Sequence, residues 1–213
     1  MKFDIITIFP SIIEEYINQG MVRIAQEKGA VKFCVHDLRK WAEDVRKTVD
    51  DTPYGGGPGM VMKIEPIYKA LKELKTENSV VCITTPKGEK LKQSQIKKLS
   101  QNTNAHFIII CGRYEGVDQR VHDNLVDFEF SIGEYILSGG ELAALVLVDS
   151  ITRLLPDVLG NKESLESESF DNEGDMDFPQ YTKPEDFNGW KVPEVLLSGH
   201  HKNIKDWRNQ NRI

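Results

Sequence analysis

The sequence lacks several features that would place it in a special class of protein. No apolar run among its 213 residues reaches the roughly 18–20 residues that a membrane-spanning helix needs. Its start, MKFDIITIF, has neither a basic segment nor a small-residue cleavage site, so we expect no export signal. The only cysteines are Cys34, Cys82 and Cys111, an odd and widely spaced set. This excludes a disulfide framework and indicates buried, reduced thiols in a cytoplasmic protein.

The sequence also lacks an excess of positive charge. It has 27 Lys and Arg against 33 Asp and Glu, a net charge of -6. This argues against indiscriminate nucleic-acid binding, which depends on broad positive potential. Basic residues nevertheless cluster at 39–47, 87–98 and 191–212, which leaves specific RNA binding open. The five histidines show no metal-ligand spacing, so we expect no metal site.

The first three quarters of the chain alternate between strand-like and helix-like patterns. Runs rich in β-branched residues predict strands at 2–9, 31–36, 80–84, 106–111 and 126–130. Apolar spacing predicts helices over 11–29, with Ser11 as the cap, and over 65–75, 91–100 and 141–155. This alternation predicts an α/β domain with a parallel sheet over residues 1–158. The last helix is apolar on most faces, which is typical of a deep core or a subunit interface.

The composition changes after residue 158. The segment 160–186 carries nine acidic residues and few large aliphatic ones. We therefore expect an acidic, flexible linker over 159–189, poorly ordered in the absence of a ligand. Residues 190–213 are basic and expected to be helical, with Trp190 and Trp207 as packing anchors.

Four irregular segments carry the candidate chemistry. They are 50–60 (DDTPYGGGPGM), 84–88 (TTPKG), 111–118 (CGRYEGVD) and 131–140 (SIGEYILSGG), and the last three each follow a predicted strand. Open α/β sheets bind ligands at the carboxyl ends of their strands. Glycine lets a ligand approach the main chain closely. Together these loops predict a nucleotide-like ligand that is held largely by backbone groups.

These segments resemble one family. PYGGGPGM, CGRYEG, SIGEYILSGGE, the run Asp149–Arg153 and VPEVLLSGHH, in this order, resemble the bacterial tRNA (guanine-N1)-methyltransferases of the TrmD type, in the SPOUT superfamily. The resemblance implies methylation of N1 of guanosine-37, next to the anticodon of tRNA, with S-adenosylmethionine as donor. It also implies a homodimer with a shared active site, and it leaves magnesium assistance open.

The resemblance adds a feature that periodicity does not predict. The parallel sheet would contain a deep trefoil knot, roughly over residues 80–155, although general rules of chain connection disfavour knots. A flexible linker and a small helical C-terminal domain would follow, and this domain looks shortened and would contact tRNA.

Site residues also follow from the resemblance. The residues implied for donor binding are Thr85, Pro86, Gly112, Tyr114, Ser131, Ile132, Gly133, Glu134, Tyr135, Ile136, Leu137, Gly139 and Gly140. Those implied for binding the tRNA substrate are Asp50, Gly57, Pro58, Gly59 and Glu115.

Two residues are implied for catalysis. Guanine N1 carries a proton at neutral pH, so a carboxylate is needed as general base, and a guanidinium would stabilise negative charge on O6. Arg153 matches the family arginine. Glu168 stands where the family motif Asp-Ser-Phe has aspartate, and its side chain is one methylene longer. Asp171 and Asp177 are nearby carboxylates that could substitute for it.

Two alternatives remain at this stage. The chain could be a donor-binding SPOUT-like protein that binds RNA with weak or no methyl transfer, or an α/β enzyme acting on a small molecule. A methyl group added to tRNA in an Arg153-dependent manner separates the first alternative from the methyltransferase.

Overall fold

The computed structural model describes residues 1–158 and 176–212. The chain divides into two compact units, Met1–Gly160 and Asn161–Ile213. None of the helices in these described ranges is long and apolar enough to span a membrane.

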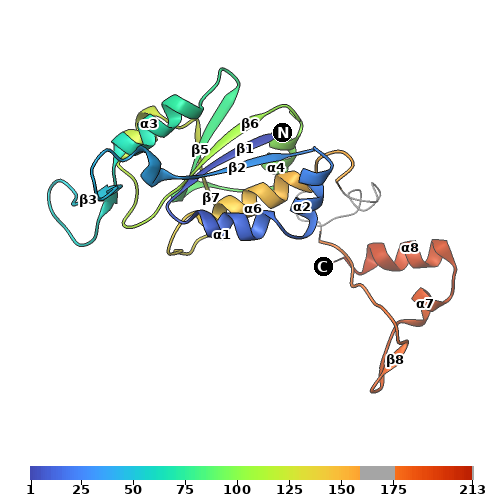
Figure 1. Ribbon diagram of the computed structural model, residues 1–213. Helices are drawn as coiled ribbons and strands as arrows, with labels where there is room; N and C mark the ends of the chain where they lie inside the picture. Colours follow the sequence, from blue (N-terminus) through green and yellow to red (C-terminus); the bar gives the residue numbers. More distant parts are fainter. Residues whose placement is uncertain (159–175, 213) are drawn as a thin grey trace. The chain divides into compact units, whose positions relative to one another are not determined.

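A five-stranded sheet forms the centre of the first unit (Figure 1). Its strands are β1 (Lys2–Thr7), β2 (Lys32–Asp37), β5 (Ser79–Lys90), β6 (His106–Cys111) and β7 (Phe128–Ser131). Their order is β2-β1-β6-β5-β7, and every pairing is parallel. All six residues of β6 are buried, as expected for a strand covered on both faces. The predicted α/β fold with a parallel sheet is confirmed.

Helices cover both faces of this sheet. One hydrophobic core contains Phe107 and Ile109 and packs against α1 (Pro10–Ile17), α2 (Gly20–Glu27), α4 (Gln93–Ser100) and α6 (Glu141–Thr152). The other contains Ile108 and Ile110 and packs against the short 3-10 helix η1 (Leu38–Trp41), α3 (Ile64–Leu74) and α5 (Gln119–Asn124). Successive side chains of β6 therefore point to opposite faces, which explains its unbroken apolar sequence.

The structure corrects two local predictions. The helix expected over 11–29 is two helices, α1 and α2, and Gly20 begins the second with a φ of 55°. The first begins at Pro10 with Phe9 at the N-cap, so Ser11 is not the cap. Proline suits this first helical position because its φ is already helical and its missing N–H is not needed there.

The second correction concerns residues 84–88, which we expected to form a loop. Strand β5 continues through them to Lys90, with a register shift between Thr84 and Glu89 where it pairs with β7. A Cβ on Gly88 would overlap the backbone of Phe130. Glycine at position 88 therefore lets the two strands approach, a requirement that single-sequence reading does not reveal.

The second unit is small. It contains the hairpin β8 (Asp186–Phe187) and β9 (Trp190–Lys191), followed by α7 (Glu194–Leu197) and α8 (His201–Gln210). Trp207 contacts Tyr181, with ring centroids 6.3 Å apart. Trp190 lies 6.0 Å from Phe187 but remains 75% exposed, so it is not the packing anchor we expected.

The cysteines behave as expected of unpaired thiols. All three are free, and Cys82 and Cys111 are buried. Burial raises the pKa of both buried thiols, which therefore stay protonated and unreactive.

A buried carboxylate links three neighbouring strands of the sheet. Asp4 accepts hydrogen bonds from Lys2 Nζ at 2.6 Å, from His36 Nε2 at 2.6 Å and from His106 Nε2. Burial alone would raise the pKa of Asp4, but the bonds from His36, Lys2 and His106 outweigh it and hold that pKa well below its usual range. Asp4 is therefore ionised in the folded protein and joins β1, β2 and β6.

This network makes stability depend on pH. We expect Asp4→Asn to lower the free energy of unfolding by about 1–3 kcal/mol at pH 7, as for a charged buried hydrogen bond. Because the pKa is depressed in the folded state, the stabilisation is fully present above the unfolded pKa of about 3.9 and is lost progressively as pH falls from there through the folded pKa. Urea unfolding at pH 7 and at about pH 2 measures this. If the difference in free energy of unfolding between the wild type and Asp4→Asn did not shrink at the lower pH, the prediction would be contradicted. Glu43→Gln, which neutralises an exposed carboxylate, is the control.

Candidate functional site

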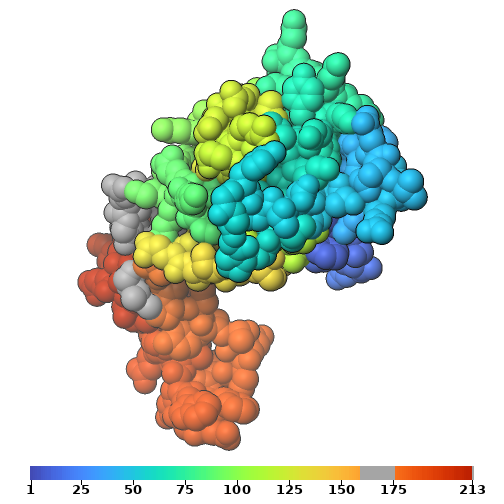
Figure 2. Space-filling model, turned by 90° about the vertical axis from the view of Figure 1, so that its left-hand side faces the viewer, coloured from blue at the N-terminus to red at the C-terminus, as the bar shows by residue number. Residues whose placement is uncertain are grey.

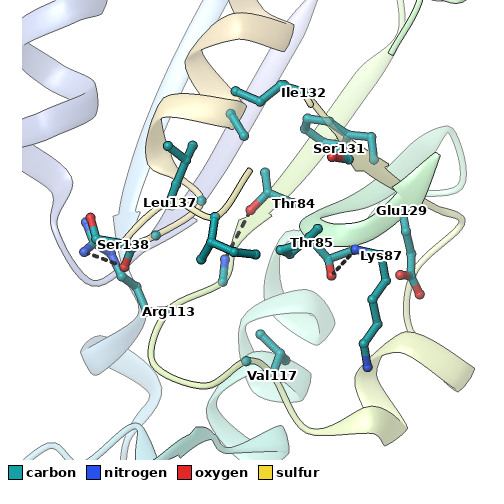
Figure 3. A pocket seen from close by; sticks show the side chains of 18 of the residues that line it. Thr84, Thr85, Lys87, Arg113, Val117, Glu129, Ser131, Ile132, Leu137 and Ser138 are labelled. Atoms are coloured by element: carbon teal, nitrogen blue, oxygen red, sulfur yellow. Dashed lines mark hydrogen bonds between the residues drawn. The ribbon is translucent and has the colours of Figure 1, made fainter. Parts of the chain in front are cut away.

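A cavity of about 510 Å³ opens where the carboxyl ends of three strands meet (Figure 3). Its wall includes residues from the carboxyl-terminal part of β5, the segment after β6, and the end of β7 with the loop that follows it, residues 131–140. This is the edge at which open parallel sheets bind ligands.

The structure brings the residues implied for donor binding together. All of them except Glu134 line the cavity: Thr85, Pro86, Gly112, Tyr114, Ser131, Ile132, Gly133, Tyr135, Ile136, Leu137, Gly139 and Gly140. The side chain of Glu134 is exposed and pairs with Lys90 at 3.0 Å, a contact that lowers the pKa of this carboxyl.

Internal hydrogen bonds shape the 131–140 loop. Gly133 N donates to Ser131 Oγ at 3.3 Å, and Tyr135 OH donates to the carbonyl of Ile132 at 3.2 Å. At the far end of the loop, Gly140 N donates to the carbonyl of Gly112 at 2.8 Å. The loop is therefore fixed at both ends and joined to the segment that follows β6.

Gly140 lies at the tightest point of this junction. A Cβ there would overlap Thr84 Oγ1 and come within 2.9 Å of Gly112 N. These two atoms already contact each other, since Gly112 N donates to Thr84 Oγ1 at 3.3 Å (Figure 3). Only glycine lets the three segments meet in this way.

We expect Gly140→Ala to weaken binding of the cavity's ligand at least tenfold, because an added methyl must push the 131–140 loop away from β5. Calorimetric titration with S-adenosylmethionine, the donor that the resemblance implies, measures this. Gly20→Ala is the matched control, since position 20 also loses a glycine, at a φ of 55°, but has open space around it and lies outside the cavity. An unchanged affinity in Gly140→Ala would contradict the expectation.

The glycine-rich segment 50–60 lies beside Glu115. Glu115 N donates to the carbonyl of Met60 at 3.0 Å, and a Cβ on Gly59 would overlap the Glu115 side chain. Figure 2 shows the face of the first unit on which this segment lies. Glu115 lines the cavity, whereas Gly57, Pro58 and Gly59 do not.

A hydrogen bond between Asp50 and Tyr114 also connects this segment to the cavity, because Tyr114 lines the cavity wall. Asp50 belongs to the short strand β3 (Asp50–Asp51), which pairs with β4 (Val61–Met62). Tyr114 adopts a left-handed φ of 60°. Burial raises the pKa of Tyr114, and the charge and hydrogen bond of Asp50 raise it further. The phenol therefore remains protonated and donates its hydrogen bond to Asp50.

The structure describes one of the two residues implied for catalysis, Arg153. Arg153 is half-buried at the C-cap of α6, where its backbone N–H contacts the carbonyl of Asp149 at 3.1 Å. It does not line the cavity. Glu168 lies outside the described residues, as does Asp171, and Asp177 belongs to the second unit.

Sequence reasoning missed several cavity residues. His122 Nδ1 and Glu129 Oε1 lie 2.9 Å apart in the wall, near Lys87. Arg113 also lines the wall and pairs with Glu141, the buried first residue of α6. The sequence did contain a signal for Glu141, because an acidic residue at the start of a predicted helix is favourable there. No sequence pattern indicated the pair of His122 and Glu129, because the two side chains come together only when α5 and β7 pack in the fold.

The fold and this cavity define an α/β protein with a ligand site at the carboxyl edge of a parallel sheet. Over residues 1–213 the chain matches the family described as tRNA (Guanine-1)-methyltransferase TrmD, and it belongs to this family. It is 52% identical to a tRNA (guanine-N(1)-)-methyltransferase of Mycoplasma capricolum, over the whole chain and 87% of that relative. Proteins of the same name from Halalkalibacterium halodurans and Dictyoglomus turgidum are 46% and 48% identical over the whole chain, and 87% and 85% of those relatives are covered.

Proposed function

We propose that this protein transfers the methyl group of S-adenosylmethionine to N1 of the guanosine next to the anticodon of tRNA. Membership in the family supports the reaction class. The observation that carries the proposal is the cavity, in which nearly all the residues implied for donor binding meet.

The cavity suits such a donor in size and in chemistry. Ligand sites commonly enclose roughly 300–1,000 Å³, so about 510 Å³ accommodates a nucleoside joined to an amino acid. Added side-chain atoms at Gly139 and Gly140 would overlap neighbouring side chains. Glycine at these positions lets the loop backbone pack against Arg113 and Thr84, and main-chain groups of the loop would satisfy the polar edge of the base. When bound, the donor supplies an electrophilic methyl group.

The chain's own residues would prepare guanine as the nucleophile. In the proposal, Glu168 removes the N1 proton and Arg153 stabilises the negative charge that develops on O6. Glu115, in the cavity wall, would contact the guanine, with residues 50–60 beside it. No magnesium ligand is assigned, because the described ranges contain no cluster of three or more suitable side chains.

A methyl-transfer assay tests this function. Two tRNA transcripts that differ only at the nucleoside after the anticodon, guanosine or adenosine, are incubated with the protein and labelled donor. We expect label only on the guanosine transcript, at N1. Equal labelling of both transcripts, or none on either, would refute the proposal.

The proposed fold includes a knot over roughly residues 80–155. The strand order β6-β5-β7 and the return of residue 140 to Gly112 and Thr84 support it. The proposed organisation is a SPOUT domain over 1–158, a linker over 159–189 and a tRNA-contacting tail over 190–213. Basic residues on α8 and after it, including Lys205 and Arg208, suit an RNA backbone. We place this function in the cytoplasm.

We also propose a homodimer with a shared active site. Helices α1 and α6 lie side by side on one face of the sheet (Figure 1), and Tyr16 OH donates to Asp149 Oδ1 at 2.9 Å between them. Their outer surface is apolar and between 36% and 55% exposed at Ile12, Tyr16, Leu142 and Val146. Exposed apolar side chains on two adjacent helices suit a second copy of the same surface.

We expect the double variant Leu142→Glu/Val146→Glu to run as a monomer in light scattering, while the wild type has twice the chain mass. Two charges on each copy would be buried without partners. Tyr68→Glu, an exposed aromatic position on α3, is the matched control and should leave the mass unchanged. A dimeric double variant would contradict this interface.

A second candidate is donor binding and RNA binding with weak or no methyl transfer. Glu168, in place of the family aspartate, is the observation that favours it. Donor and tRNA binding without label on the guanosine transcript would identify this alternative.

A further inference from the structure

A buried ion pair joins three segments that are distant in sequence. Arg113 Nε donates to both carboxylate oxygens of Glu141, at 2.9 and 3.2 Å. Thr7 Oγ1 donates to the same carboxylate at 2.7 Å. The side chains of Arg113 and Glu141 are only 16% and 2% exposed. The end of β1, the segment after β6 and the start of α6 are thereby tied together.

The outer edge of the same guanidinium contacts the 131–140 loop. Arg113 Nη1 donates to the carbonyl of Ser138 at 3.0 Å (Figure 3). A Cβ on Gly139 would overlap Arg113 Nε, so the backbone at 139 lies directly against the side chain. The ring of Phe9 lies 4.6 Å from the guanidinium carbon. The guanidinium is thus held by Glu141, Phe9 and the loop.

Arginine is suited to this arrangement by its shape. Its planar group can donate from Nε to the carboxylate and from Nη1 to the carbonyl at the same time and in fixed directions. Lysine carries the same charge at a single point and cannot hold both acceptors in this geometry. Two buried charges are tolerated only because each satisfies the other.

We infer that Arg113 and Glu141 are positioning residues for the methyl donor. They set where the end of the 131–140 loop lies relative to the segment 112–115, and so fix the width of the cavity between them. Tyr114, one of the residues implied for donor binding, directly follows Arg113, so the same pair also positions the opposite wall of the donor site. This inference rests on the proposed function, because it takes S-adenosylmethionine as the ligand of the cavity.

The variant Arg113→Lys tests the inference in the full chain. Calorimetric titration with S-adenosylmethionine should show at least a tenfold rise in Kd, and the KM for the donor should rise in step. The Kd for tRNA should stay within twofold, and kcat should change less than KM. Arg120→Lys is the matched control, because Arg120 forms an exposed pair with Asp118 outside the cavity and should change none of these values.

A second variant perturbs the contact from the loop side. Gly139→Ala keeps both charged residues but adds a methyl where the Arg113 side chain lies. Because both changes act on one contact, their effects on donor Kd should be non-additive in the double variant. This variant also keeps the inference testable if Arg113→Lys fails to fold.

The outcomes separate this inference from the proposed function. Donor affinity within twofold of wild type in either single variant would overturn the positioning role, as would additive effects. An equal loss of donor and tRNA affinity in Arg113→Lys would indicate a general structural role and also overturn it. A wild-type chain that binds no donor would instead refute the proposed function.

Discussion

Replacing Glu168 by glutamine is expected to lower methyl transfer to tRNA by about 10²–10⁴-fold, the usual contribution of a general base. Glutamine has nearly the same shape as glutamate but cannot take the N1 proton. Glu168 lies outside the described residues, and its assignment comes from its place in the segment Glu168-Ser169-Phe170. Because the cavity is built from residues 84–143, binding of S-adenosylmethionine should be unchanged.

Single-turnover methyl transfer on the guanosine transcript, with calorimetric titration of the donor, measures both parts of this prediction. Glu168→Asp shortens the side chain and restores the family motif, so it should retain activity. Asp171→Asn and Asp177→Asn are the matched controls. Full activity in Glu168→Gln would exclude this residue as the base, and loss in one of the two controls would move the role to that carboxylate.

Replacing Arg153 by alanine should lower kcat/KM by about 10²–10³-fold, the usual cost of removing one preorganised donor to developing negative charge. Arg153→Lys should recover part of this, because it keeps the charge but loses the planar fork. Donor affinity should change less than twofold, since Arg153 does not line the cavity. The measurement is steady-state methyl transfer together with donor titration.

A purely structural role for Arg153 makes a different prediction. A cation at the end of α6 interacts favourably with the helix dipole, an effect of roughly 0.3–1 kcal/mol on stability. In that case Arg153→Ala would lower the melting temperature slightly and leave kcat/KM nearly unchanged. Arg120→Ala, which removes an exposed arginine outside the cavity, controls for loss of charge.

The sequence by itself determined the α/β class, the parallel sheet and most of its elements. Strand β6 shows why: a short, unbroken apolar run is what a strand buried on both faces requires, and this requirement is local. The resemblance of its motifs also identified the family, and all but one of the residues implied for donor binding line the cavity. Glycine-rich segments after strands carry this information because backbone conformation depends on local sequence.

Only the tertiary structure decided the contacts between distant segments. Strand β5 runs on through 84–88 because β7 lies beside it, and no pattern within those residues requires this. Asp4 meets His106, and Arg113 meets Glu141, across 102 and 28 residues of sequence. Such pairs produce no periodic pattern in the sequence, because the sequence does not distinguish a charged residue that faces water from one that faces a buried partner. Their partners are set by how the strands and helices pack, and this packing also gives the 131–140 loop its shape.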